Sequence, residues 1–291
     1  MIITNEEGYP QALVDACQSD YELEPNEWRV TSLLKGPREA ILERRHSHEI
    51  TRDVSDMIWL LFGTSVHSLL ERVPIGPLEF REERIKIPIG GYVLSGKFDS
   101  YDAGEKLLTD YKTCSVWQII NKRFDHWRQQ LLIYAWMLEK IGFECNRARV
   151  MTLAKDHRRS LAKFEKGYPR KPGQAIPFTF SKKDFGDIEV WLIERFSEIA
   201  RLEQLPDDQL PVCTPEERYN SGTKYAVMKK GKKRAVRLFD NAQAAQDHIA
   251  KGKGDFVEIR PGEDKKCMDY CVACEFCNYY KEKVEKHVQS A

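Results

Sequence analysis

The sequence predicts an α/β protein with a mixed central sheet flanked by helices, followed by a small ββαβ module. Three observations support this prediction. Strand-like and helical patterns alternate along the first two thirds of the chain, a second and shorter set follows, and half of the eight cysteines gather near the C-terminus. The strand-like segments are 92–101, 105–113 and 147–154, the helical ones are 31–45, 53–72, 122–141 and 181–205, and the later set spans 225–260.

The most informative local feature is a predicted β-hairpin that turns at Asp102-Ala103-Gly104. Side chains alternate across a strand, so Asp110 and Lys112 share one face of the second strand. Asp99 lies near them on the neighbouring strand. Two carboxylates and an amine that converge in this way suit a hard cation such as Mg²⁺ or Mn²⁺.

Such a grouping is suited to phosphodiester hydrolysis. A bound metal lowers the pKa of a water molecule and neutralises charge on the phosphate, while a lysine stabilises the crowded intermediate. The alternative is a surface hairpin with solvated charges. Apolar residues around the motif favour a half-buried hairpin whose charged face lines a cleft: Phe98, Leu107, Leu108 and Tyr111.

The helical segment 53–72 carries an apolar stripe, and Gly63 interrupts it one turn before His67. Glycine inside a helix costs about 1 kcal/mol relative to alanine. Its position therefore suggests that room is needed beside the imidazole. The alternative interpretation is a structural or exposed histidine.

On the helical segment 122–141, Gln130 and Tyr134 are one turn apart and point the same way. The segment is strongly apolar, and a buried glutamine needs a hydrogen-bonding partner. We expect the pair to position substrate at the cleft wall.

Glu82 and Glu83 precede the hairpin on a strand-like run. One of them is a candidate for the outer metal shell, and the other is explained by a solvated strand face.

Taken in their order along the chain, these motifs resemble those of the PD-(D/E)XK nuclease superfamily, specifically its RecB-like branch. This branch includes CRISPR adaptation exonucleases and phage-encoded exonucleases. The resemblance covers about residues 30–155. It implies a restriction-endonuclease-like fold and metal-dependent cleavage of DNA by an exonuclease in recombination, repair or phage DNA metabolism. The matching motifs are Gly63 to His67, Gly96 to Asp99, Asp110 to Thr113 and Gln130 to Tyr134. The implied metal ligands are His67, Asp99 and Asp110, with Lys112 as the catalytic lysine and Gln130 and Tyr134 beside it.

The cysteines form a second candidate site. Without a secretory signal, they favour reduced thiols or metal ligation over disulfides. Closely spaced thiolates commonly bind Zn²⁺ or an iron–sulfur cluster. The resemblance implies a [4Fe–4S] cluster held by one distant cysteine and three near the C-terminus, and Zn²⁺ is the alternative. The corresponding residues here are Cys213, Cys267, Cys271 and Cys277.

The sequence does not decide which cysteine is the first of these ligands. The CRISPR-associated relatives carry a cysteine immediately before a Pro-Arg pair, whereas Gly36 precedes Pro37-Arg38 in this chain. Cys213 is the best substitute, because it opens the segment that the terminal cysteines close. Cys17 and Cys274 are the other candidates.

Between these ligands lies the predicted ββαβ module, whose first hairpin carries a run of basic residues without an acid. Charged hairpins are often only solvated. Beside a nuclease cleft, however, lysines that contact phosphates supply affinity that does not depend on sequence. The predicted DNA-binding residues are Lys229, Lys230, Lys232, Lys233 and Arg234.

The remaining predictions concern organisation and partners. The net charge of +1 does not by itself indicate a polyanion partner. No apolar run approaches the roughly 20 residues that span a bilayer, and no signal peptide is visible, so we expect a cytoplasmic protein. The expected partners are DNA and a recombination or replication protein. The competing hypothesis is a catalytically inactive DNA-binding or partner-docking protein.

The sequence also predicts four divisions of the chain. They are an accessory segment (1–30), the nuclease core (31–210), the basic module (211–262) and the cysteine-rich segment (263–291).

Overall fold

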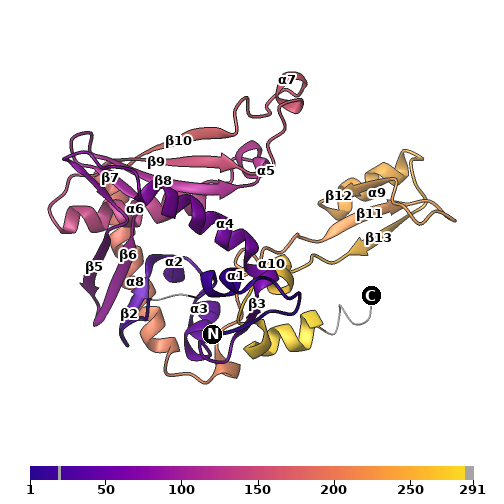
Figure 1. Ribbon diagram of the computed structural model, residues 1–291. Helices are drawn as coiled ribbons and strands as arrows, with labels where there is room; N and C mark the ends of the chain where they lie inside the picture. Colours follow the sequence, from indigo (N-terminus) through magenta and orange to yellow (C-terminus); the bar gives the residue numbers. More distant parts are fainter. Residues whose placement is uncertain (19–20, 286–291) are drawn as a thin grey trace. The chain divides into compact units, whose positions relative to one another are not determined.

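The computed structural model describes residues 1–18 and 21–285 of the chain (Figure 1). These residues form two compact units, which are described separately. The first unit consists of Met1–Ala40 and Ser47–Gln204, and the second consists of Ile41–His46 and the chain from Leu205 onward. Across the described ranges, no helix is both long and apolar enough to cross a bilayer.

A five-stranded mixed sheet with the order β10-β9-β8-β7-β4 is the centre of the first unit. β8 and β9 are parallel, and the other neighbouring strands are antiparallel. A parallel pair needs a crossover connection, which α5 and α6 supply here. The strands are Gly173–Thr179 (β10), Arg147–Ala154 (β9), Leu107–Cys114 (β8), Ser100–Asp102 (β7) and Glu79–Arg81 (β4), and the helices are Val116–Ile120 (α5) and Asp125–Lys140 (α6).

A three-stranded sheet with the order β2-β6-β5 adjoins the central sheet along the chain. β4 leads into β5 and β6 leads into β7, so two strands bend together from one sheet into the other. At the bend, the backbone N–H of Glu82 donates to the carbonyl of Asp99 at 3.0 Å. The prediction of one continuous strand over 92–101 was wrong, because β6 pairs with β2 and β5 whereas β7 pairs with β4 and β8. The strands are Glu27–Arg29 (β2), Arg84–Ile89 (β5) and Tyr92–Lys97 (β6).

Helices pack against these sheets, and α6 contributes a long buried segment to the core. Every residue from Gln130 to Leu138 is buried. α6 contacts β8, β9 and α8, and α4 contacts β8. The helices are Val54–Glu71 (α4), Leu161–Phe164 (α7) and Lys182–Leu202 (α8).

The predicted helix over 31–45 is instead two helices, Val30–Leu33 (α2) and Pro37–Arg45 (α3). Gly36-Pro37 separates them. A residue before proline is sterically disfavoured in the α conformation, whereas proline itself is well suited to the first turn of a helix. The break therefore has a local cause.

The N-terminal residues belong to the first unit. β1 (Ile2–Thr4) pairs in parallel with β3 (Thr51–Asp53), and α1 spans Gln11–Ala16. Cys17 is buried in an apolar cluster with Val54 and Met57.

The second unit contains the predicted ββαβ module, whose elements are confirmed. Its antiparallel sheet has the order β12-β11-β13, and α9 packs against all three strands. The longer segment of the unit starts at Leu205, where the proline-containing segment 205–215 predicts a boundary. The elements are Lys224–Met228 (β11), Arg237–Phe239 (β12), Ala242–Ala250 (α9), Phe256–Arg260 (β13) and Lys265–Asp269 (α10), with short turns of helix at Asp207–Gln209 (η1), Cys274–Phe276 (η2) and Tyr280–Glu285 (η3).

Candidate metal-dependent active site

Three elements of the first unit bring acidic and basic side chains together. β8 carries Asp110 and Lys112, α4 carries His67, and the bend between the two sheets carries Asp99 and Glu82. The alternation of side chains along β8 puts Asp110 and Lys112 on one face, as predicted. Their side chains form an ion pair with 2.9 Å between Lys112 Nζ and Asp110 Oδ2.

Glu82 is held in an unusual backbone conformation. Its φ is +53°, in the left-handed region that residues with a Cβ seldom occupy. Such strain concentrates at functional sites, where the surrounding structure enforces it. Here it ends β4 and directs the carboxylate toward α4, where Glu82 Oε1 lies 3.3 Å from His67 Nδ1. Lys97 Nζ contacts the other oxygen of Glu82 at 2.6 Å.

Asp99 completes a group of three possible metal ligands. Its Oδ1 lies 3.4 Å from His67 Nδ1. Among the described residues, the ligand atoms of His67, Glu82 and Asp99 all lie within 4.8 Å of one another. One imidazole nitrogen and two carboxylate oxygens are donors that Mn²⁺ and Mg²⁺ accept.

The position of Asp99 is fixed by β8. The backbone N–H of Tyr111 donates to Asp99 Oδ2 at 2.6 Å, so the carboxylate lies against the strand that carries Asp110. Asp110 itself is only 3% exposed. Asp99 thus lies beside the strand that carries Asp110 and Lys112, as the hairpin predicts. The three residues whose ligand atoms meet within 4.8 Å include Glu82 and not Asp110, which was the predicted ligand.

The pKa shifts reflect the crowding of these carboxylates. Burial, and then the neighbouring charge of Asp110, raise the pKa of Asp99 to about 7, although His67 and Lys112 oppose the rise. The hydrogen bond with Glu82 raises the pKa of His67 against the effect of burial. Burial would raise the pKa of Glu82, but His67 and Lys97 outweigh it and hold that pKa below its ordinary value. Nearby carboxylates repel each other unless a cation lies between them.

Gln130 and Tyr134 of α6 are both buried and point toward each other. Gln130 Nε2 donates to the Tyr134 hydroxyl at 3.4 Å. Burial raises the pKa of Tyr134, and the charges of Asp110 and Asp99 add to the rise. The tyrosine thus lies within electrostatic reach of the carboxylates.

The glycines of the motifs have different structural reasons. A Cβ on Gly96 would lie 2.6 Å from Cε1 of Tyr134, so the absence of a side chain at this position makes room for the tyrosine ring. We expected Gly63 to make room for the imidazole of His67. The neighbour within 4 Å of a Cβ there is instead Thr113 Oγ1, at 3.4 Å. Gly63 therefore lies where α4 approaches β8.

The sequence left open whether Glu82 or Glu83 contributes to the metal site. Two adjacent glutamates on a strand-like run were the available signal, but alternation alone could not choose between them. The choice depends on the left-handed backbone at Glu82, which follows from the bend.

The C-terminal cysteines lie in the second unit. Burial, then Asp264 and the neighbouring Cys213 and Cys277, raise the pKa of Cys267 to about 12. Cys213 is thus close enough to Cys267 for their charges to interact, although more than fifty positions separate them in the chain. Cys17, by contrast, is 5% exposed within the apolar cluster described above.

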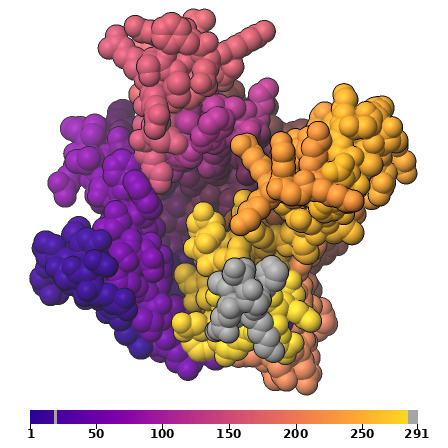
Figure 2. Space-filling view, turned by 90° about the vertical axis from the view of Figure 1, so that its right-hand side faces the viewer, coloured from indigo at the N-terminus to yellow at the C-terminus, as the bar shows by residue number. Residues whose placement is uncertain are grey.

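The basic residues of the ββαβ module are exposed. They occupy the turn between β11 and β12, and Figure 2 shows long side chains of the orange segment that project from the surface. The residues concerned are Lys229, Lys230, Lys232, Lys233 and Arg234.

No protein-family model matches the chain, and a search of curated proteins found no match. Among solved structures, SSO0001 is 18% identical with a TM-score of 0.46, covering 67% of this chain and 85% of that one. A phage related exonuclease from Haemophilus somnus 129PT is 13% identical with a TM-score of 0.29, covering 66% and 76%. LHK-Exo in complex with dAMP is 14% identical with a TM-score of 0.36, covering 61% and 93%. At these TM-scores and identities, we draw neither fold nor activity from the similarities.

Proposed function

We propose that this chain is a divalent-metal-dependent deoxyribonuclease that degrades DNA from an end. The observation that carries the proposal is the meeting of His67, Glu82 and Asp99 within 4.8 Å, beside the Asp110–Lys112 ion pair. The order of the motifs supports the same activity. The choice of DNA and of attack from an end rests on the resemblance to RecB-like nucleases.

The donor set fits a hard divalent cation. His67, Glu82 and Asp99 would hold it, with Asp110 contributing from β8. When bound, the cation would acidify a water molecule and neutralise charge on the scissile phosphate.

The remaining side chains have roles of their own. Lys112 carries an ammonium group that is held by Asp110 and can stabilise negative charge on a phosphate oxygen. Gln130 and Tyr134 present an amide and a hydroxyl from the adjacent helix, and both groups can form hydrogen bonds with the DNA strand. These contacts orient the phosphate with respect to Lys112.

The decisive experiment uses Asp110→Asn and Lys112→Ala with end-labelled linear DNA and covalently closed circles. We expect each variant to lower Mg²⁺- or Mn²⁺-dependent degradation by at least about 100-fold, the size of effect seen when one charge-stabilising group is removed. DNA binding should persist. Lys106→Ala, on the β7–β8 turn, is the matched control and should degrade DNA normally.

Two results would reject this function. One is unchanged degradation by Asp110→Asn, which would point to a contaminating nuclease. The other is the absence of cation-dependent cleavage in the wild type with DNA binding intact, which would favour the non-catalytic DNA-binding hypothesis.

We also propose a metal on Cys213, Cys267, Cys271 and Cys277, with [4Fe–4S] favoured over Zn²⁺ by the resemblance. The effect of Cys213 and Cys277 on the pKa of Cys267 supports three of these four ligands. Anaerobic purification followed by iron and zinc quantification distinguishes the two ions. Protein without stoichiometric iron or zinc would reject the site.

The basic turn of the ββαβ module is the proposed DNA-binding surface. Its exposed ammonium and guanidinium groups can release counterions from the DNA backbone, which makes binding depend on salt. Replacing Lys229, Lys230 and Lys232 by glutamine should therefore reduce the slope of affinity against salt concentration.

A further inference from the structure

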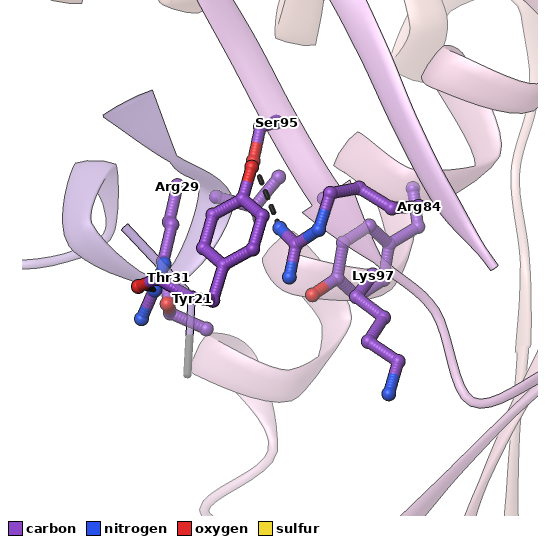
Figure 3. A pocket seen from close by; sticks show the side chains of 9 residues that line it. Tyr21, Arg29, Thr31, Arg84, Ser95 and Lys97 are labelled. Carbon is purple, nitrogen blue, oxygen red and sulfur yellow. Dashed lines mark hydrogen bonds between the residues drawn. The ribbon is translucent and has the colours of Figure 1, made fainter. Parts of the chain in front are cut away.

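A cavity of about 250 Å³ in the first unit is lined mainly by residues that have no part in the active site described above. It opens between the short β2–α2 segment and the β5–β6 hairpin. Figure 3 shows that its side chains are mostly cationic, hydroxyl or aromatic. The side chains labelled there are Tyr21, Arg29, Thr31, Arg84, Ser95 and Lys97.

Two arginines of the cavity have no carboxylate partner among the described residues. Within residues 1–18 and 21–285, neither Arg29 nor Arg84 forms an ion pair with a carboxylate. Arg84 Nη1 donates to the neutral hydroxyl of Ser95 at 3.0 Å, and Arg29 Nη2 donates to the carbonyl of Tyr21 at 3.1 Å. Arg29 Nε is buried and makes no hydrogen bond to the described residues. Lys97 is the exception, since it is paired with Glu82.

The two guanidinium groups are held in place by one aromatic ring. Arg84 Cζ lies 3.8 Å from the centroid of the Tyr21 ring, and Arg29 Cζ lies 5.0 Å from it (Figure 3). The hydroxyl of Tyr21 donates to Glu27, a fully buried carboxylate that Lys86 Nζ contacts at 2.9 Å. Stacking orients a guanidinium while its N–H groups stay available to a ligand.

The cavity also shares a wall with the active site. Tyr134 and Gly96 line it, and both belong to the motifs that surround Asp99. The negative charges of Asp110 and Asp99 raise the pKa of Tyr134, and the positive charge of Arg84 lowers it. Lys97 lines the cavity and contacts Glu82, one of the candidate metal ligands.

We propose that this cavity binds a phosphate group of the nucleic-acid strand that the active site cuts, with Arg29 and Arg84 donating to its oxygens. Guanidinium groups match the oxygens of a tetrahedral phosphate and form strong charge-assisted hydrogen bonds with it. The choice of a nucleic-acid phosphate rests on the proposed function. The anion site itself rests on the two arginines without a carboxylate partner among the described residues.

A direct test measures binding of inorganic phosphate by calorimetry without divalent cations, so that cleavage plays no part. Arg84→Gln and Arg29→Gln should each weaken binding by about 10-fold or more, as expected for loss of a charged hydrogen-bond donor. Arg84→Lys should retain part of the affinity, because it keeps the charge but not the forked geometry. Arg147→Gln removes the same charge from an exposed position on β9 and should bind phosphate like the wild type.

Thermal unfolding of each variant separates lost binding from lost folding. Weaker phosphate binding at an unchanged Tm supports the proposal. If a glutamine variant is destabilised, the folded Arg84→Lys protein supplies the comparison. Phosphate binding that is absent in the wild type, or equal in the wild type and all four variants, overturns the proposal.

The source of the phosphate is identified with oligonucleotides that carry a 5′-phosphate, a 3′-phosphate or only hydroxyl ends. A loss in Arg84→Gln confined to one phosphorylated end assigns the cavity to that terminal phosphate. An equal loss on all three assigns it to an internal phosphodiester. No loss on any of them rejects nucleic acid as the ligand. If the wild type binds phosphate but cleaves no DNA, the proposed function fails and the anion site stands.

Discussion

Gly96 and Tyr134 are 38 positions apart, yet each explains the presence of the other. The tyrosine ring occupies the space that a Cβ on residue 96 would need. The Gly-x-x-Asp and Gln-x-x-x-Tyr patterns are thus two sides of one packing contact. This contact brings α6 against β6 and holds Tyr134 near the carboxylates.

Gly96→Ala tests this contact. Forcing a methyl group into a filled space typically costs about 1–3 kcal/mol, so we expect a lower free energy of unfolding and slower DNA degradation. Gly186→Ala is the matched control, since it lies in α8 with no atom within 4 Å of the added Cβ. That variant should be more stable by about 0.5–1 kcal/mol, as expected for glycine replaced within a helix. Urea unfolding measures both, and equal effects at the two positions would contradict the packing argument.

Glu82 illustrates a residue that local rules do not identify. Its left-handed backbone and its contacts with His67 and Lys97 arise where two strands leave one sheet for another. In the sequence it is one of two adjacent glutamates. The same contacts make it a candidate metal ligand.

Among the helices and strands, those with strong local signals are present where the sequence predicts them. The helix predicted over 181–205 is α8, which Ser181 caps in a reciprocal capping box with Asp184, and Phe180 contacts Phe185 as a hydrophobic staple. The strand over 147–154 is also confirmed. The bend in the strand over 92–101 was missed, because it depends on which neighbours each half pairs with.

Glu27 on the short strand β2 is expected to make the stability of the fold depend on pH. Glu27 is fully buried there, and burial alone would raise its pKa. Hydrogen bonds from Ser95, Tyr21 and Lys86 outweigh burial and lower the pKa of Glu27 from 4.5 to about 2. A lowered pKa means that the carboxylate stabilises the fold above pH 4.5, and that this contribution is lost as the pH falls toward 2.

Glu27→Gln removes this titration. We expect the variant to be less stable than the wild type at pH 7, with a difference that shrinks as the pH is lowered from 4.5 toward 2. Chemical unfolding at a series of pH values measures the two curves. Parallel curves over this range would show that Glu27 does not titrate as described.

At the scale of the whole molecule, the chain consists of two compact units with different chemistry. The first holds the candidate active site and the cationic cavity, and the second holds the basic module and the clustered cysteines. Cys213 and Cys267 lie on either side of the ββαβ module in the chain. A metal on these thiols would close a long loop and add its binding free energy to the folding of the second unit.

This predicts a local response to metal loss. Cys267→Ser, or treatment with a strong chelator, should accelerate amide hydrogen exchange in the second unit. Exchange in β8 should be unchanged, because that strand lies in the core of the first unit. Equal acceleration in both units, or none in either, would argue against a structural metal on these cysteines.

The sequence by itself determined the features that depend on near neighbours. These are the shared face of Asp110 and Lys112, the helical spacing of Gln130 and Tyr134, and the cap of α8, since strand alternation and helical periodicity are local. Tertiary structure alone decided that Glu82 joins His67 and Asp99, and that Arg29 and Arg84 meet around Tyr21. Those groups come from segments far apart in the chain, and only the bend between the sheets and the packing of the N-terminal segment bring them within contact.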